Sequence, residues 1–264
     1  MKIARNHKFS PLLMLALIQV ALESISLHSI CLADPFQDSA AESVVGEFAL
    51  PAAPEQFVDL VERGKVEFEF YDHKKDPRKF PAETRFEFSL TFEYRYTFDI
   101  RETNGQRTAV IKPRLRDLKI DSPNKIFLPT TYRSEKIWSI WVVAHEFEHV
   151  RLNCDARPRL LTEYLLKQIK IMDQTLAAGE SVDKDKIKET YSASVKVIRD
   201  EVVRIIQANN DYLDEVTRHG AKKLEDPEAF FAELYTAENL AKHEFAYLDD
   251  ARTLLQSRIY RENK

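Results

Sequence analysis

Apolar and polar residues alternate strictly along residues 86–100. Apolar side chains hold every even position from Phe86 to Ile100, and polar side chains hold the odd positions between them. Because successive side chains of a strand point to opposite faces, this pattern predicts a half-buried β-strand with one aromatic and one wet face. Asn104-Gly105 follows, a pair that tolerates the positive φ of a tight hairpin turn. We expect an antiparallel sheet, with further strands near residues 65–71, 108–111 and 115–120.

The second half of the chain carries helical patterns. Residues 137–152 contain no Gly or Pro and follow Ser134, a residue type that caps helix N-termini. Further helices are predicted at residues 159–178, at residues 183–219 with Gly220 after them, and from Asp226-Pro227 toward the C-terminus. The predicted fold class is α+β: an N-terminal antiparallel β-sheet packs through its aromatic face on a C-terminal helical half.

Composition and charge narrow the class of protein. A chain of 264 residues that is 44% hydrophobic is long and apolar enough to bury one substantial core. The formal net charge is -4 and no basic stripe is visible, so nucleic acid is not an expected partner.

The N-terminus has the pattern of an export signal. Lys2, Arg5 and Lys8 precede an apolar run at residues 11–22, which is too short for a comfortable membrane span, and Ala33 is a small residue suited to cleavage. We therefore expect a signal peptide over residues 1–33 and a linker over residues 34–55. The mature chain would be secreted or periplasmic, with no stable membrane span. An uncleaved N-terminal anchor is the alternative.

His145-Glu146-Phe147-Glu148-His149 has the form His-Glu-x-x-His and lies within a predicted helix. Residues four apart share one helix face, so His145 and His149 are placed to bind one metal ion. Glu146 lies one position round the helix, within reach of a water at that metal. Two imidazoles and this carboxylate are the minimal form of a hydrolytic zinc site. The alternative is a helix with two half-exposed histidines and solvated glutamates.

A catalytic zinc ion needs a third protein ligand and one open position. The stretch from Asp214 to Gly220 gathers several ligand-type side chains at the end of the long predicted helix. His219 is the best candidate there, and its alternative role is that of a histidine interacting with the dipole at a helix C-terminus.

Three other residues are weaker candidates for the third ligand. Asp155 lies six residues after His149, but Leu152 stands where such a site needs a glycine to turn the chain. Cys154 is poorly placed on a continuing helix, and it is the one cysteine left after cleavage, so no internal disulfide is expected. His243 fits a solvated position on the last helix better.

The order of these motifs resembles a bacterial family described as predicted secreted zinc-dependent proteases. The resemblance covers about residues 60–222. The chain departs from the family pattern at Glu148, where the family often has Gly, and at Leu213, where it often has Tyr. The matching residues are Leu128-Pro129, Trp138 or Trp141, His145-Glu146 with His149, and Asp214, Thr217, His219 and Gly220.

The resemblance implies an exported zinc metallopeptidase that hydrolyses a peptide or related amide bond. It implies His145, His149 and His219 as ligands of Zn2+, with Asp214 as an alternative ligand or as a carboxylate that orients one. Glu146 would be the general base for the attacking water. The catalytic domain would be zincin-like and span residues 56–222, with a C-terminal helical extension over residues 223–264.

The expected partner is therefore a peptide or protein substrate. Tyr212 is a first guess for the group that stabilises the oxyanion. Two alternatives remain open: an exported module with a structural metal site, and a helical partner-binding surface without any metal.

Overall fold

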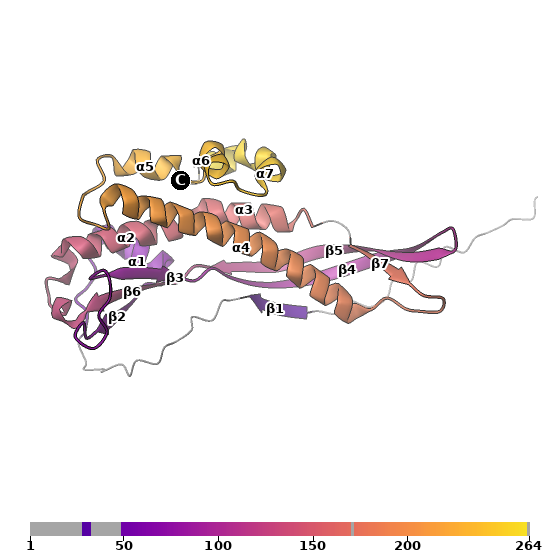
Figure 1. Cartoon of the computed structure of the whole chain (residues 1–264), viewed down its shortest axis with the longest axis horizontal. Coiled ribbons are helices and arrows are strands. Elements are labelled where there is room, and N and C mark those ends of the chain that lie inside the picture. Colours follow the sequence, from indigo (N-terminus) through magenta and orange to yellow (C-terminus); the bar gives the residue numbers. More distant parts are fainter. Residues whose placement is uncertain (1–27, 33–48, 170–171, 263–264) are drawn as a thin grey trace, which may run out of the picture.

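The computed structural model describes residues 28–32, 49–169 and 172–262 of the chain. The strands form one layer and the helices another, and the long helix α4 runs along much of the molecule (Figure 1). The sheets come mainly from the N-terminal half and the helices mainly from the C-terminal half, which confirms the predicted α+β class.

The larger sheet has the strand order β1-β4-β5-β7 within the described residues, and all its neighbouring strands are antiparallel. Asn104 and Gly105 form the β4–β5 turn with φ of 53° and 77°, as their sequence predicts. The two strands expected at residues 108–120 are one strand, and a register shift near Asp117 (φ 45°) explains the break in their alternation. The strands are β1 (His28–Leu32), β4 (Ser89–Thr103), β5 (Gln106–Asp121) and β7 (Met172–Leu176).

The smaller sheet is mixed rather than antiparallel. Its central strand β6 (Asn124–Pro129) pairs parallel with β2 (Glu67–Tyr71) and antiparallel with β3 (Glu83–Phe86). The chain leaves this sheet after β3, makes the long β4–β5 hairpin and returns as β6, a connection long enough for parallel pairing. The sequence pattern did not predict β3 or β6.

The motif helix α2 begins later than expected, at Trp141, and ends at Asn153. Residues 137–139 form a separate 3-10 turn and Ile140 is extended, so Ser134 does not cap α2. Helix α3 (Ala156–Leu166) is shorter than its predicted helix, because residues 172–176 pair with β5 as strand β7.

The long helix α4 (Lys184–Thr217) agrees closely with its prediction. Asp183 caps it by accepting a hydrogen bond from the Lys186 amide, and Arg218 ends it in the left-handed conformation. The single helix predicted after Asp226-Pro227 is instead broken, with positive φ at Tyr235 and Glu244. The described helices there are α5 (Pro227–Glu233), α6 (Ala237–Lys242), α7 (Leu248–Leu255) and α8 (Arg258–Glu262).

Two apolar clusters hold the layers together. The aromatic face of β4 packs mainly on α3 and α4, where the Tyr191 ring lies 4.7 Å from the Tyr94 ring and 5.9 Å from the Phe92 ring. The second cluster joins α1 (Glu55–Arg63), the smaller sheet and α2, with Phe57 and Phe147 ring centroids 4.5 Å apart. Burial of each such side chain stabilises the fold by about 1.5–3 kcal/mol.

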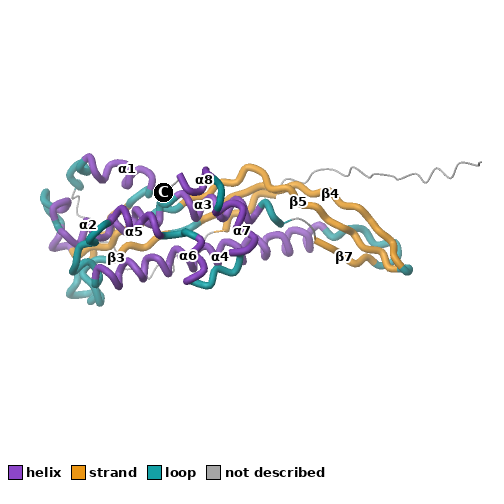
Figure 2. The backbone as a smooth tube through the Cα atoms, turned by 90° about the horizontal axis from the view of Figure 1, so that it is seen from above, coloured by secondary structure: helices purple, strands orange, loops and turns teal. Residues whose placement is uncertain are grey.

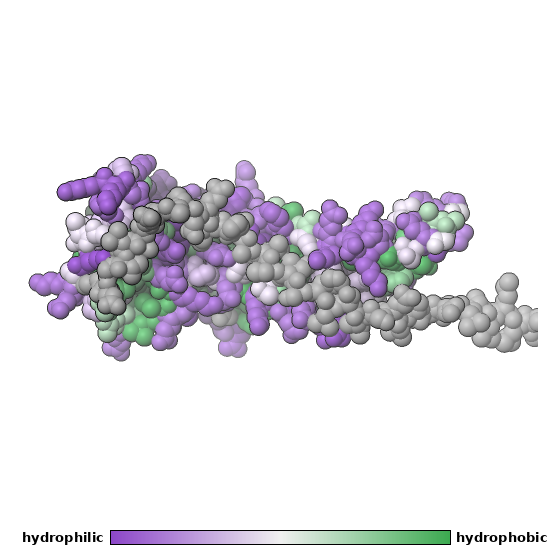
Figure 3. All heavy atoms as spheres, turned by 90° about the horizontal axis from the view of Figure 1, so that it is seen from below, coloured by the Kyte–Doolittle hydropathy of each residue, from purple (hydrophilic) through white to green (hydrophobic). Residues whose placement is uncertain are grey.

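The outer end of the β4–β5 hairpin extends beyond the helical layer (Figure 2). Burial along β4 declines in that direction, from Leu90 at 0% exposed to Ile100 at 46%. Seen from below, the described surface is mainly hydrophilic with scattered apolar patches (Figure 3). The aromatic face of β4 is therefore a buried face only where helices cover it.

Five residues of the predicted signal peptide form an edge strand of the larger sheet among the described residues. Residues 28–32 form β1, which pairs with β4 so that Ile30 is opposite Phe92. The rest of the predicted signal peptide, its cleavage site at Ala33 and most of the predicted linker lie outside the described residues. Among the described residues, no helix is long and apolar enough to span a membrane.

Candidate metal centre

Helix α2 presents two buried histidines to α4. Val143, Phe147 and Val150 bury one side of α2 against the smaller sheet. The other side carries His145 and His149, which are 2% and 7% exposed. Their Nε2 atoms lie 3.2 Å apart, as the spacing of four residues predicts.

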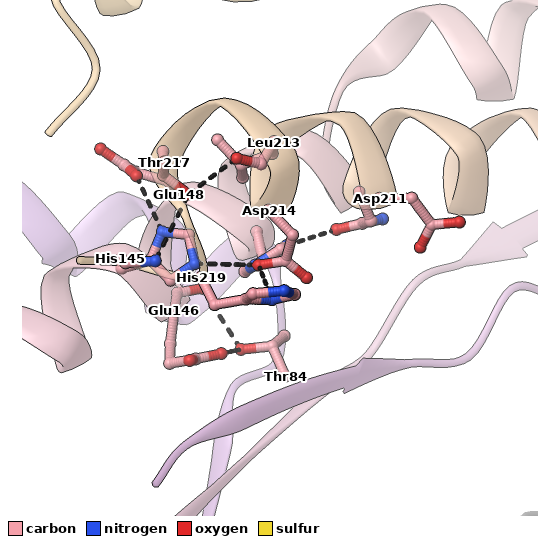
Figure 4. Close-up of polar contacts among 12 residues, drawn as sticks. Thr84, His145, Glu146, Glu148, Asp211, Leu213, Asp214, Thr217 and His219 are labelled. Carbon is pink, nitrogen blue, oxygen red and sulfur yellow. Dashed lines mark hydrogen bonds and ion pairs between the residues drawn. The ribbon is translucent and has the colours of Figure 1, made fainter. Parts of the chain in front are cut away.

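Asp214 of α4 completes a compact group of three donor atoms. Its Oδ1 lies 3.2 Å from His145 Nε2 and 3.3 Å from His149 Nε2. Figure 4 shows His145 and Asp214 facing one another from the two helices. Ligands at tetrahedral zinc distances are separated by roughly 3.3–3.4 Å, so the three donors already have the spacing of one face of such a site. His145, His149 and Asp214 form a possible metal-binding triad.

Each histidine has an acceptor at its second ring nitrogen. Glu148 Oε2 lies 3.2 Å from His145 Nδ1, and Asn210 Oδ1 lies 2.7 Å from His149 Nδ1. Because these oxygens accept hydrogen bonds, the Nδ1 atoms donate, and the Nε2 atoms are the ring nitrogens that face Asp214. Both rings are therefore oriented as metal ligands.

The charges of the triad stabilise one another strongly. Burial lowers the pKa of His145, but its hydrogen bonds to Asp214 and Glu148 outweigh this and raise that pKa to about 9. Burial raises the pKa of Asp214, but both histidines outweigh it and hold this pKa well below its usual value. Asp214 is therefore ionised at neutral pH, the form in which a carboxylate binds metal.

Glu146 lies beside the triad and is held by the smaller sheet. Thr84 of β3 donates a 2.6 Å hydrogen bond to Glu146 Oε2. Burial raises the pKa of Glu146, opposed by His149 and by the Thr84 hydroxyl. One carboxylate oxygen of Glu146 is thus held by the Thr84 hydroxyl.

A cavity of about 370 Å³ opens onto these groups. One wall is residues 80–86, which include β3, and the opposite wall comes mainly from α2 and α4. Within the described residues β3 is an edge strand, because only β6 pairs with it. The cavity therefore combines a strand edge, a carboxylate and the triad.

His219 lies in the cavity wall rather than within the triad. Its Nδ1 is 3.4 Å from Asp214 Oδ1, its side chain is 45% exposed, and its ring stacks on Phe80 at 4.0 Å. Arg218, His219 and Gly220 all have positive φ, so the chain turns sharply away from α4 after Thr217. This turn brings the His219 ring beside Asp214 but outside the compact group of donors.

Gly220 packs directly against His145. A Cβ atom on Gly220 would lie 2.8 Å from His145 Cδ2, closer than real Cβ contacts allow. The Trp141 indole donates to the Gly220 carbonyl from the start of α2. Gly220 thus packs closely against one side of the His145 ring.

Comparison of the chain with protein-family models, with curated proteins and with solved structures finds no match. The resemblance to secreted zinc-dependent proteases therefore stays an expectation.

The structure brings together His145, Glu146, His149 and Asp214, and it places His219 next to them. Asp214, expected as the alternative ligand or an orienting carboxylate, holds the third position of the compact group. The weaker candidates lie elsewhere: Asp155 forms a buried ion pair with Arg157, and Cys154 lies near Asn124.

Tyr212, the residue first suggested to stabilise the oxyanion, also lies away from the cavity. Tyr212 stacks on Phe230 and under the Lys242 ammonium, and it is not among the residues that line the cavity. Sequence reasoning missed Thr84 and Asn210. Asn210 had a signal, because it lies four residues before Asp214 and so on the same face of α4. Thr84 had none, since its strand was not predicted.

Proposed function

We propose that this chain is an exported zinc-dependent metallopeptidase that hydrolyses a peptide or related amide bond. The observation that carries the proposal is the triad, whose three donor atoms lie 3.2–3.3 Å apart beside the Glu146 carboxylate. Two neutral imidazoles and one carboxylate are a donor set that zinc prefers at catalytic sites. Zinc held there would supply Lewis acidity, which polarises carbonyls and makes water a better nucleophile near neutral pH.

The residues of the chain have distinct tasks in this proposal. Glu146 takes the proton of the attacking water on the carboxylate oxygen that Thr84 leaves free, and then passes it to the leaving amine. The edge of β3 that no other described strand occupies binds an extended peptide by main-chain hydrogen bonds, which aligns the scissile bond along the cavity. His219, with its ring on the cavity wall, replaces Tyr212 as the candidate donor to the developing oxyanion.

The test combines metal content with hydrolysis of an unbiased peptide library. Purified mature chain is expected to hold one zinc ion by elemental analysis. Glu146→Gln should keep the zinc and lose hydrolysis, whereas His149→Ala should lose both. An unchanged rate in zinc-loaded, folded Glu146→Gln would refute the proposed mechanism.

A structural metal site is the second candidate, because the donors come from two helices and both histidines are buried. A metal of that kind would staple α2 to α4 and leave no open position. Chelation would then unfold the chain, and Glu146→Gln would change nothing. The cavity beside the triad favours the catalytic site instead.

A further inference from the structure

Three buried asparagines connect His149 to the start of β6 and to the C-terminal end of α1. Asn210 accepts from His149 Nδ1 at 2.7 Å and donates to Asn153 Oδ1 at 2.8 Å. Asn153 in turn donates to Asn124 Oδ1 at 2.8 Å. Asn124 donates to the Ser122 carbonyl at 2.9 Å and to the Gly64 carbonyl at 3.2 Å. All three asparagines are at most 7% exposed.

The direction of this row of hydrogen bonds is fixed by its ends. The carbonyl oxygens of Ser122 and Gly64 can only accept, so the amide nitrogen of Asn124 must face them. Asn210 Nδ2 also donates to the Ile206 carbonyl at 3.0 Å. Every amide is thereby prevented from flipping, and the last oxygen in the row must face His149.

The row also brings α1 close to α2. A Cβ atom on Gly64 would lie 2.7 Å from the Leu60 carbonyl and 2.9 Å from Val150 Cγ1. The Gly64 carbonyl, at the end of α1, accepts hydrogen bonds from the backbone N–H of Asn124 at 2.9 Å and from its side chain at 3.2 Å. Four sequence segments, at Gly64, at Ser122 with Asn124, at Asn153 and at Asn210, thus support one imidazole.

A fixed acceptor matters because Asp214 competes for the same proton. The Asp214 carboxylate lies 3.3 Å from His149 Nε2, and a proton drawn there would block the atom that must bind metal. An acceptor at Nδ1 keeps the proton on the opposite side of the ring. Without Asn210, the buried ring would place its proton toward Asp214.

We propose that Asn210, Asn153 and Asn124 are positioning residues, which together hold the proton of His149 on Nδ1 and reserve Nε2 for a metal ion. The inference rests on the proposed metal function. It does not require hydrolysis, because the position of a proton is measurable without substrate.

The first test uses metal-free chain and nitrogen-15 NMR of the imidazoles, at a pH at which the His149 ring is neutral. Wild-type chain should carry the proton on Nδ1, and Asn210→Ala should move it to Nε2. Asn153→Ala leaves Asn210 in place but removes the acceptor of the Asn210 side-chain amide. We therefore expect a mixture of the two His149 tautomers, with the proton on Nδ1 in some molecules and on Nε2 in others. Asn209→Ala is the matched control, because Asn209 is a buried α4 amide bonded to Asn239 instead.

The second test measures zinc affinity by competition with a chromophoric chelator. Asn210→Ala should bind zinc about 10–100-fold more weakly than Asn209→Ala. A proton on Nε2 in wild-type chain, an Asn153→Ala spectrum identical to wild type, or equal affinity in the two alanine variants would overturn the inference. A wild-type chain that binds no zinc would refute the proposed function, while the NMR result would still test the three asparagines.

Discussion

Gly220→Ala is expected to weaken the metal centre by pushing on one ligand ring. Gly220 has a φ of 76°, and its added Cβ would lie 2.8 Å from His145 Cδ2 and 2.9 Å from Cγ. The neighbour cannot yield easily, because the His145 ring is held by Asp214 on one side and Glu148 on the other. Either the ring tilts away from the triad or the turn after α4 moves.

The cost of this change has two parts. An alanine in the left-handed conformation costs about 1–2 kcal/mol, and overfilling a packed site costs about 1–3 kcal/mol. The free energy of unfolding should therefore fall by about 2–5 kcal/mol. Gly179→Ala separates the two parts, because Gly179 has a φ of 79° and nothing within 4 Å of the added atom. In Gly179→Ala the free energy of unfolding should fall only by the backbone cost of about 1–2 kcal/mol.

Urea unfolding and zinc competition measure the two consequences. Gly220→Ala should unfold at lower urea than Gly179→Ala and bind zinc about tenfold more weakly or worse, as expected when support of a ligand is disturbed. Equal stability in the two variants, with zinc affinity unchanged, would show that the His145 ring does not lie against Gly220.

Three further predictions concern the ligand set, the general base and the core. Asp214→Ala should abolish tight zinc binding, whereas His219→Ala should keep the zinc and reduce hydrolysis; the reverse result in elemental analysis would make His219 the ligand. Thr84→Val removes the 2.6 Å hydrogen bond to Glu146, so kcat should fall about tenfold or more with unchanged zinc content. Burial and the nearby Tyr94 raise the pKa of Tyr191 from 10.0 to about 12. The unfolded chain then loses its proton first, so stability present below pH 10 is lost as the pH rises to 12. Wild type should lose about 3 kcal/mol more than Tyr191→Phe over that interval, as followed by urea unfolding, and equal losses would contradict burial of this hydroxyl.

Local periodicity explains which parts of the site the sequence predicted. His145, Glu146 and His149 belong to one helix, so their arrangement follows from a spacing of four residues. The positions of His219 and Asp214 relative to the two histidines of α2 depend on where α4 ends. Because the helix stops at Thr217, Asp214 still faces α2 from a regular turn, while His219 lies beyond it in a left-handed bend.

Pairing between distant segments explains what the sequence did not predict. Residues 172–176 carry a pattern compatible with a helix, and they become a strand because the edge of β5 is available beside them. Strand β3 has only four residues, too few for a clear alternation, yet it supplies Thr84 and the cavity wall. The role of each asparagine beside His149 depends on neighbours from three segments, which no local pattern contains.

The triad lies at the seam between two hydrophobic clusters. Helix α2 contributes Val143, Phe147 and Val150 to the cluster around α1 and the smaller sheet, whereas α4 contributes to the cluster under the larger sheet. A ligand held by both helices adds its binding free energy to the association of these two halves. A bound metal ion would therefore make the two clusters unfold together. A chelator should divide the single thermal unfolding transition of the metal-loaded chain into two.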